Sequence, residues 1–143
     1  MILVDVNLLI YATSATARHH QAAHDWLDSQ LNGTSRVGLP WGSLLGFLRI
    51  MTNRRAFAHA MATETAWNHI EAWLSCDPVW IPQPTERHAV VLGSLCAQPG
   101  VHGDLVSDAH LAALAIEHGL TLCSTDGDFA RFRELKWMDP LAR

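Results

Sequence analysis

The most informative part of the chain for its fold is residues 101–129, VHGDLVSDAHLAALAIEHGLTLCSTDGDF. Its first half has the apolar spacing of a helix and stops at Gly119, a residue suited to a left-handed helix cap. LTLC then has the composition of a buried strand, and STDGDF that of the loop leaving its carboxyl end. In open parallel sheets, ligands bind outside the carboxyl ends of the strands. The stretch therefore predicts a helix–strand unit with a site in its last loop.

Four aspartates lie in this stretch: Asp104, Asp108, Asp126 and Asp128. Asp104 and Asp108 stand four residues apart, so one helical turn can place them on the same face. Three of the four also have an ordinary structural explanation. Asp104 could cap the helix, Asp126 opens a turn dipeptide with the next residue, and Asp128 could cap a short helix after it. Asp108 lies at the border of the buried helix face and is harder to explain in this way.

Strand-like and helix-like segments alternate along the rest of the chain. Further strands are expected at 2–5, 36–39, 79–81 and 135–138, and helices at 7–13, 19–31, 41–53, 63–75 and 86–97. This alternation predicts an α/β fold with three layers (α/β/α) and a mainly parallel central sheet. A length of 143 residues, without a linker or repeat, predicts one domain over residues 1–143.

The first strand also ends on an acid, Asp5, which is followed closely by Asn7. An acid in this place is where α/β enzymes hold a metal ligand or nucleophile. The alternative is an Asx-turn that joins strand to helix, with Asn7 as the helix N-cap. The residues alone leave both explanations open.

The acids are most informative as a group, because the predicted topology brings them to one edge of the sheet. Two carboxylates about 4 Å apart repel by about 4 kcal/mol at an effective dielectric near 20. A divalent cation among them would relieve this repulsion. Oxygen ligands without cysteine or histidine favour Mg²⁺ or Mn²⁺ over zinc, and such ions can clamp a phosphate and activate water.

Composition narrows the class of protein. A hydrophobic share of 49% fits a folded domain, and three cysteines without a CxxC pair argue against a disulfide framework or a structural zinc site. No apolar run is long enough to span a bilayer and no basic leader is recognisable, so we expect a cytoplasmic protein that does not contact membranes. The net charge of −4 hides an acid-free segment containing Arg49, Arg54 and Arg55. These arginines could contact RNA phosphates or simply relieve the dipole of the helix before them.

Three segments carry a family resemblance: ILVDVNLLIYA at the start, LPWGSLLGFLRIMTN in the middle, and VHGDLVSDAHLAALAIEHGLTLCSTDGDFARF near the end. Together they resemble the PIN-domain ribonucleases, and specifically the VapC-type toxins of bacterial toxin–antitoxin pairs. The resemblance covers nearly the whole chain, and its last segment is the most specific. It implies a PIN-like fold, Mg²⁺-dependent RNA cleavage, a cognate antitoxin as partner and frequent homodimer formation.

The resemblance also implies roles for individual residues. Asp5, Asp108 and Asp126 match the family's catalytic acids, which are also metal ligands, and Asp128 matches a further acid in the same loop. Supporting hydrogen bonds would come from Asn7 and from Ser124 or Thr125.

One family feature is missing. Many members carry a glutamate in the helix that here reads WGSLLGFLRIM, where Gly46 and Phe47 stand instead. No acid occurs between Asp28 and Glu64, so a shifted alignment cannot restore it. Asp104 is our candidate for a replacement metal ligand.

The sequence therefore predicts a metal-dependent endoribonuclease toxin that hydrolyses structured RNA, with transfer RNA favoured and ribosomal RNA second. The alternative is a catalytically weak or inactive PIN-fold module that binds RNA or protein. A haloacid-dehalogenase-like phosphatase is disfavoured, because the chain lacks a second aspartate at Asn7 and its only lysine is Lys136. An antitoxin would cover the acids with a basic side chain, and an exposed apolar groove involving Trp41, Phe47 or the first helices could serve as its docking surface.

Overall fold

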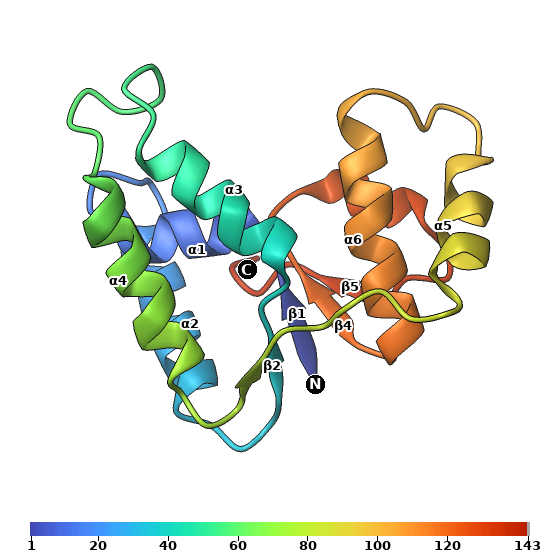
Figure 1. The fold of residues 1–143 in the computed structure, drawn as a ribbon, viewed down its shortest axis with the longest axis horizontal. Helices are drawn as coiled ribbons and strands as arrows, with labels where there is room; N and C mark the ends of the chain where they lie inside the picture. The colour runs from blue at the N-terminus through green and yellow to red at the C-terminus, as the bar shows by residue number, and fades with distance from the viewer. Residues whose placement is uncertain (143) are drawn as a thin grey trace.

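The computed structural model describes residues 1–142, and in that range it contains five strands and six α-helices (Figure 1). The strands are β1 Ile2–Val4, β2 Val37–Gly38, β3 Val79–Trp80, β4 Thr121–Cys123 and β5 Trp137–Met138. The helices are α1 Val6–Thr13, α2 His20–Leu31, α3 Trp41–Met51, α4 Thr63–Leu74, α5 His88–Cys96 and α6 Asp104–His118. A 3₁₀ helix at Gly127–Arg131 follows β4. None of these helices is both long and apolar enough to cross a membrane.

The five strands form one sheet in the order β3-β2-β1-β4-β5, and every neighbouring pair is parallel. The predicted α/β class with a mainly parallel sheet is therefore confirmed. In the central pair, Leu3 of β1 lies opposite Leu122 of β4, and Val4 lies opposite Cys123. This register brings the carboxyl ends of β1 and β4 side by side, which is where the predicted acids follow.

Helices cover both faces of the sheet, which gives the expected three layers. Figure 1 shows α1 to α4 gathered on one side of the strands and α5 and α6 on the other. Successive strand residues alternate between two hydrophobic clusters, as a pleated strand requires. Leu3 and Leu122 pack with α5 and α6, whereas Val4 and Cys123 pack with α1 to α4.

The start of α1 differs from its prediction. We expected Asn7 as the N-cap, but the helix begins at Val6 and Asp5 caps it, with Asp5 Oδ1 accepting from the Val6 backbone amide at 2.8 Å. The Asx-type role considered for Asp5 is thus real, and it leaves the second carboxylate oxygen for other contacts. Asn7 does not cap the helix, and its side-chain amide donates to Ser124 instead.

The acids of the 101–129 stretch also cap differently from the prediction. α6 begins at Asp104 directly after Gly103, which has φ +59°, so Asp104 stands in the first turn and is not the cap. At the far end, Gly119 has φ +67° and ends the helix as predicted. The 3₁₀ helix is capped by Asp126, whose side chain accepts from the Asp128 amide, and not by Asp128.

The two residues proposed to line an apolar groove differ in burial. Phe47 is fully buried, with its ring 4.8 Å from that of Trp73, so it cannot line an open groove. Trp41, the other predicted groove residue, is 37% exposed at the start of α3.

Candidate active site

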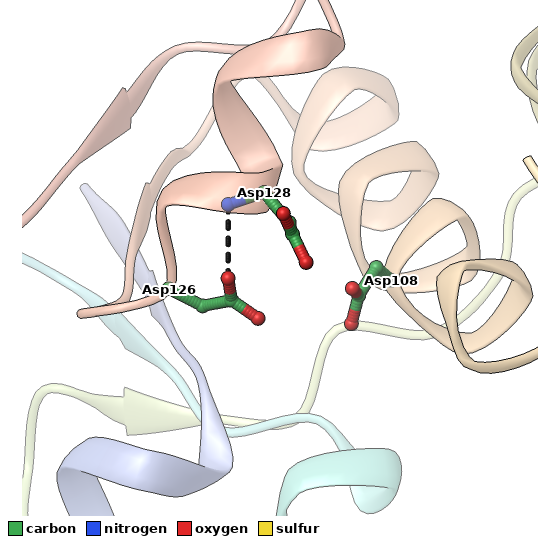
Figure 2. A group of neighbouring side chains, drawn as sticks. All are labelled: Asp108, Asp126 and Asp128. Carbon is green, nitrogen blue, oxygen red and sulfur yellow. Dashed lines mark hydrogen bonds between the residues drawn. The ribbon is translucent and has the colours of Figure 1, made fainter. Parts of the chain in front are cut away.

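Three carboxylates meet beyond the carboxyl end of β4. Asp108, Asp126 and Asp128 each offer one oxygen, and these oxygens all lie within 4.8 Å of one another. Figure 2 shows Asp108 reaching from α6 toward Asp126 and Asp128, which come from the loop and the first turn of the 3₁₀ helix. The sequence-predicted association of these acids is therefore present in the structure.

The local geometry of the 126–128 turn explains why two of the acids face the same space. Asp126 Oδ1 accepts from the Asp128 backbone amide at 2.9 Å (Figure 2). This bond starts the 3₁₀ helix and fixes one oxygen of Asp126. The other oxygen of Asp126 and both oxygens of Asp128 have no hydrogen bond to the described residues, so they remain available to a ligand.

Asp5 approaches the site from β1. It lines a cavity of about 380 Å³ together with Asp108, Gly42, Gly46 and Arg49. Asp5 Oδ1 caps α1, and Asp5 Oδ2 accepts from Ser124 Oγ at 2.8 Å. Asp5 is not one of the three acids with mutually close oxygens, so it lies beside that cluster, after the neighbouring strand β1.

Ser124 joins the acids into one network. Its side chain is fully buried, and its hydroxyl donates to Asp5 Oδ2. The same oxygen accepts from Asn7 Nδ2 at 3.1 Å and from the Asp126 backbone amide at 3.0 Å. A hydroxyl has one proton and two lone pairs, so these three bonds use its whole capacity. Of the two predicted alternatives, Ser124 makes these bonds, while Thr125 makes no side-chain hydrogen bond within residues 1–142.

Asn7 presents an oxygen without a partner next to this network. Because the Ser124 proton already points at Asp5, Asn7 must turn its amide nitrogen toward the hydroxyl. Its Oδ1 is then buried without any hydrogen bond in the described part of the chain. A buried acceptor left unpaired costs about 1–3 kcal/mol. A cation, or a water molecule held by one, would satisfy it, so Asn7 supports the fit of the acid cluster to a metal.

The electrostatics of the acids are unfavourable without a cation. The pKa of Asp108 is raised to about 6, first by burial and then by the charges of Asp126, Asp5, Asp128 and Asp104, in that order. Burial also raises the pKa of Asp5, although hydrogen bonds from Ser124 and the next backbone amide oppose the rise. Both carboxylates are therefore harder to ionise than ordinary aspartates.

Basic side chains do little to offset this charge. Within residues 1–142, the only ion pair to any of these acids joins Arg131 to Asp128 at 4.0 Å, and both side chains are exposed. Asp5, Asp108 and Asp126 have no basic partner in that range. Four acids with one weak counter-charge are a set of oxygen ligands suited to a hard divalent ion.

The position of the missing family glutamate is visible on α3. Gly42 and Gly46 line the cavity that contains Asp5 and Asp108. A Cβ at Gly46 would lie 3.2 Å from Val6 Cγ2, whereas nothing lies within 4 Å of one at Gly42. Asp104, our candidate replacement, is exposed and lies outside the three-acid cluster; it acts on Asp108 only through its charge.

The three predicted RNA-binding arginines occupy different places. Arg49 lies in α3 and lines the cavity beside Asp5 and Asp108. Arg54 and Arg55 follow the end of α3 in an exposed turn and line none of the cavities described. Arg49 is thus the member of the group that the fold places next to the acids.

Sequence reasoning missed one residue of the cavity wall, His110. It lies on α6 between the buried residues Ala109 and Leu111. The available signal was a single polar side chain within an otherwise apolar run just after Asp108, and this signal is too weak to interpret without the fold.

Comparison with known proteins agrees with this geometry. The sequence pattern described as the PIN domain matches residues 2–135. The chain belongs to the PIN-domain family.

Similar proteins place this PIN domain among VapC ribonucleases. It is 40% identical over 142 residues to Ribonuclease VapC37 of Mycobacterium tuberculosis (strain ATCC 25618 / H37Rv), with 99% of each chain covered. It is also 40% identical over 141 residues to Ribonuclease VapC33 of the same strain, again over 99% of each chain. The PIN-domain protein is therefore a member of the VapC family of ribonuclease toxins.

Solved structures share its fold at low sequence identity. VapC20 of Mycobacterium tuberculosis superposes with a TM-score of 0.68 at 18% identity, covering 92% of this chain and 94% of that one. VapBC2 of Rickettsia felis, bound to a DNA fragment from its promoter, gives a TM-score of 0.68 at 17% identity over 96% and 98%. At these identities the likeness concerns the fold.

Proposed function

We propose that this VapC-family PIN domain is a Mg²⁺-dependent endoribonuclease that acts as the toxin of a toxin–antitoxin pair. The observation that carries the proposal is the convergence of Asp108, Asp126 and Asp128, with oxygens within 4.8 Å of one another and almost no basic counter-charge. Their place beyond the carboxyl ends of the central strands is where parallel α/β folds bind ligands.

Each acidic residue has a role in this proposal. Asp108, Asp126 and Asp128 would hold a metal ion, and Asp5, which follows the neighbouring strand β1, would complete the site. Asn7 offers its unpaired oxygen to the ion or to water around it. The set consists of oxygen atoms only, which favours Mg²⁺, with Mn²⁺ as a substitute. A bound divalent ion neutralises phosphate charge and makes water a stronger nucleophile.

Residues that do not contact the metal also have roles in this proposal. Ser124 orients Asp5 and the backbone of Asp126, so the carboxylates keep their spacing when RNA arrives. Arg49 lies on the wall of the same cavity and can pair with a backbone phosphate. Arg54 and Arg55 follow α3 in an exposed turn, and we propose that they contact neighbouring phosphates.

The substrate we propose is a structured RNA, transfer RNA first and ribosomal RNA second. VapC20, which shares the fold, is described as a toxin that cleaves the sarcin–ricin loop, and this supports ribosomal RNA as a candidate. Our preference for transfer RNA follows from the family resemblance.

We further propose a cognate antitoxin and a homodimer. The Rickettsia felis VapBC2 and the FitAB structures that share this fold are named as two-component assemblies. An antitoxin would inhibit most simply by placing a basic side chain among the under-neutralised acids. The exposed Trp41 and Leu45 on α3, at 37% and 57% exposure, lie on the helix that borders this cavity and offer an apolar contact surface.

A second candidate is a PIN-fold module that binds RNA or protein without cutting. The observation in its favour is that α3 presents glycine, not an acid, to the cavity at Gly42 and Gly46. Three close carboxylates plus Asp5 still supply four acids, so we favour the enzyme.

One experiment separates the two. Purified protein freed of antitoxin is incubated with total RNA in Mg²⁺ or EDTA, and the new RNA ends are mapped, with Asp108→Asn as control. We expect cuts in Mg²⁺ only, carrying 5′-phosphate and 3′-hydroxyl ends, because water and not the ribose 2′-hydroxyl attacks. Cuts with 2′,3′-cyclic phosphates would refute this mechanism, and RNA binding without cuts would establish the second candidate.

A further inference from the structure

A chain of hydrogen bonds leads from a buried carboxylate to the wall of the acidic cavity. The Glu117 side chain, on α6, is 0% exposed and accepts from the backbone amide of Thr85 at 2.9 Å and from its hydroxyl at 2.6 Å. The other oxygen of Glu117 accepts from His88 Nδ1 on α5. His88 Nε2 then lies 3.0 Å from His110 Nδ1, with the two rings edge to face.

The carboxylate end of this chain is held in its ionised form. Burial alone would raise the pKa of Glu117, but the hydrogen bonds from Thr85 and His88 outweigh it, so the pKa lies below its usual value. An ionised carboxylate has no proton and can only accept. His88 must therefore carry its proton on Nδ1.

The tautomer of each histidine follows from this starting point. In a neutral imidazole one nitrogen donates and the other accepts, so His88 Nε2 has a lone pair. His110 must then supply the proton of the bond between them, from its Nδ1. Its second nitrogen, Nε2, is left as a hydrogen-bond acceptor. The assignment applies to the pair with both rings neutral.

The free nitrogen of His110 is accessible. Within residues 1–142, the buried side-chain polar atoms without a partner are Asn7 Oδ1 and Trp80 Nε1, so His110 Nε2 is not buried. It makes no hydrogen bond of its own in that range. His110 lines the cavity of about 380 Å³ that also contains Asp5 and Asp108. The fold thus presents an acceptor of fixed polarity beside the acids.

We propose that His110 contacts the substrate, accepting through Nε2 a hydrogen bond from the nucleotide next to the scissile phosphate, and that Glu117 and His88 are positioning residues that keep it an acceptor. This inference rests on the RNA cleavage proposed above. An acceptor selects N–H or O–H groups: the amino or imino hydrogens of a base, or the ribose 2′-hydroxyl. It rejects phosphate oxygens and base carbonyls.

The same hydrogen bonds also connect α5 to α6. His110 could therefore have a purely structural role, which would depend on a different ring nitrogen from the one that contacts substrate. The connection uses only Nδ1, whereas substrate contact uses Nε2. Two substitutions separate these atoms. His110→Asn keeps a polar group near the position of Nδ1, and His110→Gln keeps one near the position of Nε2. A structural role is rescued by asparagine, and a substrate contact by glutamine.

The positioning role can be tested without cleavage, by NMR of the histidine ring nitrogens at pH 8. We expect His110 to carry its proton on Nδ1 in the intact protein. In Glu117→Gln, the Thr85 amide can still only donate, so the glutamine oxygen turns toward Thr85 and its NH₂ group donates to His88. Each later bond then reverses, and the proton of His110 moves to Nε2. A His110 protonated on Nε2 in the unsubstituted protein overturns the proposal.

The contact itself is tested by mapping cuts made by antitoxin-free protein in Mg²⁺, on randomised RNA and on matched RNA with 2′-deoxy nucleotides flanking the cut. We expect His110→Asn to lower cutting at preferred sites about tenfold, the effect of one hydrogen bond, and His110→Gln to stay within about twofold. Mg²⁺ binding of both variants should match the parent protein, and so should thermal unfolding of His110→Asn, which keeps a polar group near the position of Nδ1.

The outcomes of the mapping identify the partner group or remove the proposal. A lost base preference in His110→Asn assigns the contact to a base, and a lost sensitivity to 2′-deoxy substitution assigns it to the ribose. If the parent protein cuts RNA and His110→Asn cuts the same sites at the same rate, the His110 contact is overturned while the proposed function stands. If the parent protein cuts nothing, the proposed function is overturned and the contact with it.

Discussion

The hydroxyl of Ser124 lies 2.8 Å from Asp5 Oδ2, although 119 residues separate the two along the chain. The bond is possible because β1 and β4 are adjacent parallel strands whose carboxyl ends coincide. The same hydroxyl receives the amide of Asn7 and the backbone N–H of Asp126. One small side chain thus fixes how acids from two strands stand relative to each other.

We expect Ser124→Ala to lower both stability and metal affinity. It leaves the amide of Asn7 and the N–H of Asp126 without their partner, which should reduce the free energy of unfolding by about 1–3 kcal/mol. Asp5 also loses its orienting donor, so Mg²⁺ affinity should fall about 10- to 100-fold. Denaturant unfolding and calorimetric titration measure the two quantities. The neighbouring Thr125→Ala is the matched control; equal losses in both variants would contradict the role given to Ser124.

Asp108 should make the metal-free protein less stable at neutral pH. Its pKa is raised to about 6 in the folded state from an ordinary value of 3.8, so its contribution to stability is fully present below the lower value and is lost as pH rises through 6. Asp108→Asn removes this loss. In EDTA at pH 7.5, we expect the variant to be more stable by roughly 1 kcal/mol after allowance for solvent screening, with little difference at pH 4.

Denaturant unfolding at the two pH values tests this expectation. Asp77→Asn removes an equal charge from an exposed residue outside the cavity and should leave the stability unchanged. In saturating Mg²⁺ the order should invert, because only the parent protein retains the complete ligand set. An Asp108→Asn variant that is less stable than the parent in EDTA at pH 7.5 would show that the ionised Asp108 carboxylate does not destabilise the metal-free protein.

Gly42→Glu should strengthen metal binding. Gly42 borders the cavity with Asp5 and Asp108, and no atom lies within 4 Å of a Cβ built there. An added carboxylate would attract the ion with little steric strain. An attraction of about 1 kcal/mol corresponds to roughly a fivefold gain in Mg²⁺ affinity. Gly42→Gln has the same length without the charge. Equal Mg²⁺ affinity in the two variants would rule out an electrostatic contribution from this face of α3.

Arg49→Gln should weaken RNA binding more than Arg54→Gln. Arg49 lines the cavity with the acids, whereas Arg54 is exposed in the turn after α3. Loss of one phosphate contact lowers the slope of log affinity against log salt by about 0.7–0.9. Binding is measured in an Asp108→Asn background, so that RNA is not cut during titration. Equal slopes for the two variants would indicate a diffuse basic surface and not a contact at the site.

The sequence predicted the parts of this site that depend on strand and helix order. An acid at the carboxyl end of an apolar strand, or in the loop that follows it, must lie at that edge of the sheet, which is why Asp5 and Asp126 could be placed before any coordinates. Asp108 could be placed because it follows one helical turn after the predicted start of α6. The alternation of Leu3 and Val4 between two cores follows from the pleat of a strand.

Other features depend on packing between segments that are distant in the sequence. The choice between Ser124 and Thr125 required the orientation of the residues after β4, and the role of Asn7 required the position of that hydroxyl. The link between His88 and His110 exists only because α5 packs against α6, and no local pattern encodes their distance. The helix caps were predicted at Asn7 and Asp128, but Asp5 and Asp126 make them. The prediction was wrong because several neighbouring polar residues compete for the same backbone amides.

The pairing of β1 with β4 also determines when the site can exist during synthesis. Asp5 is made before Asp126 and Asp128, which follow more than a hundred residues later. At 5–20 residues per second, this interval is on the order of ten seconds. Until β4 has left the ribosome, the nascent chain holds a lone carboxylate next to an unfinished sheet. A ribosome translating this message is therefore not exposed to a working nuclease until the segment carrying Asp126 and Asp128 has emerged.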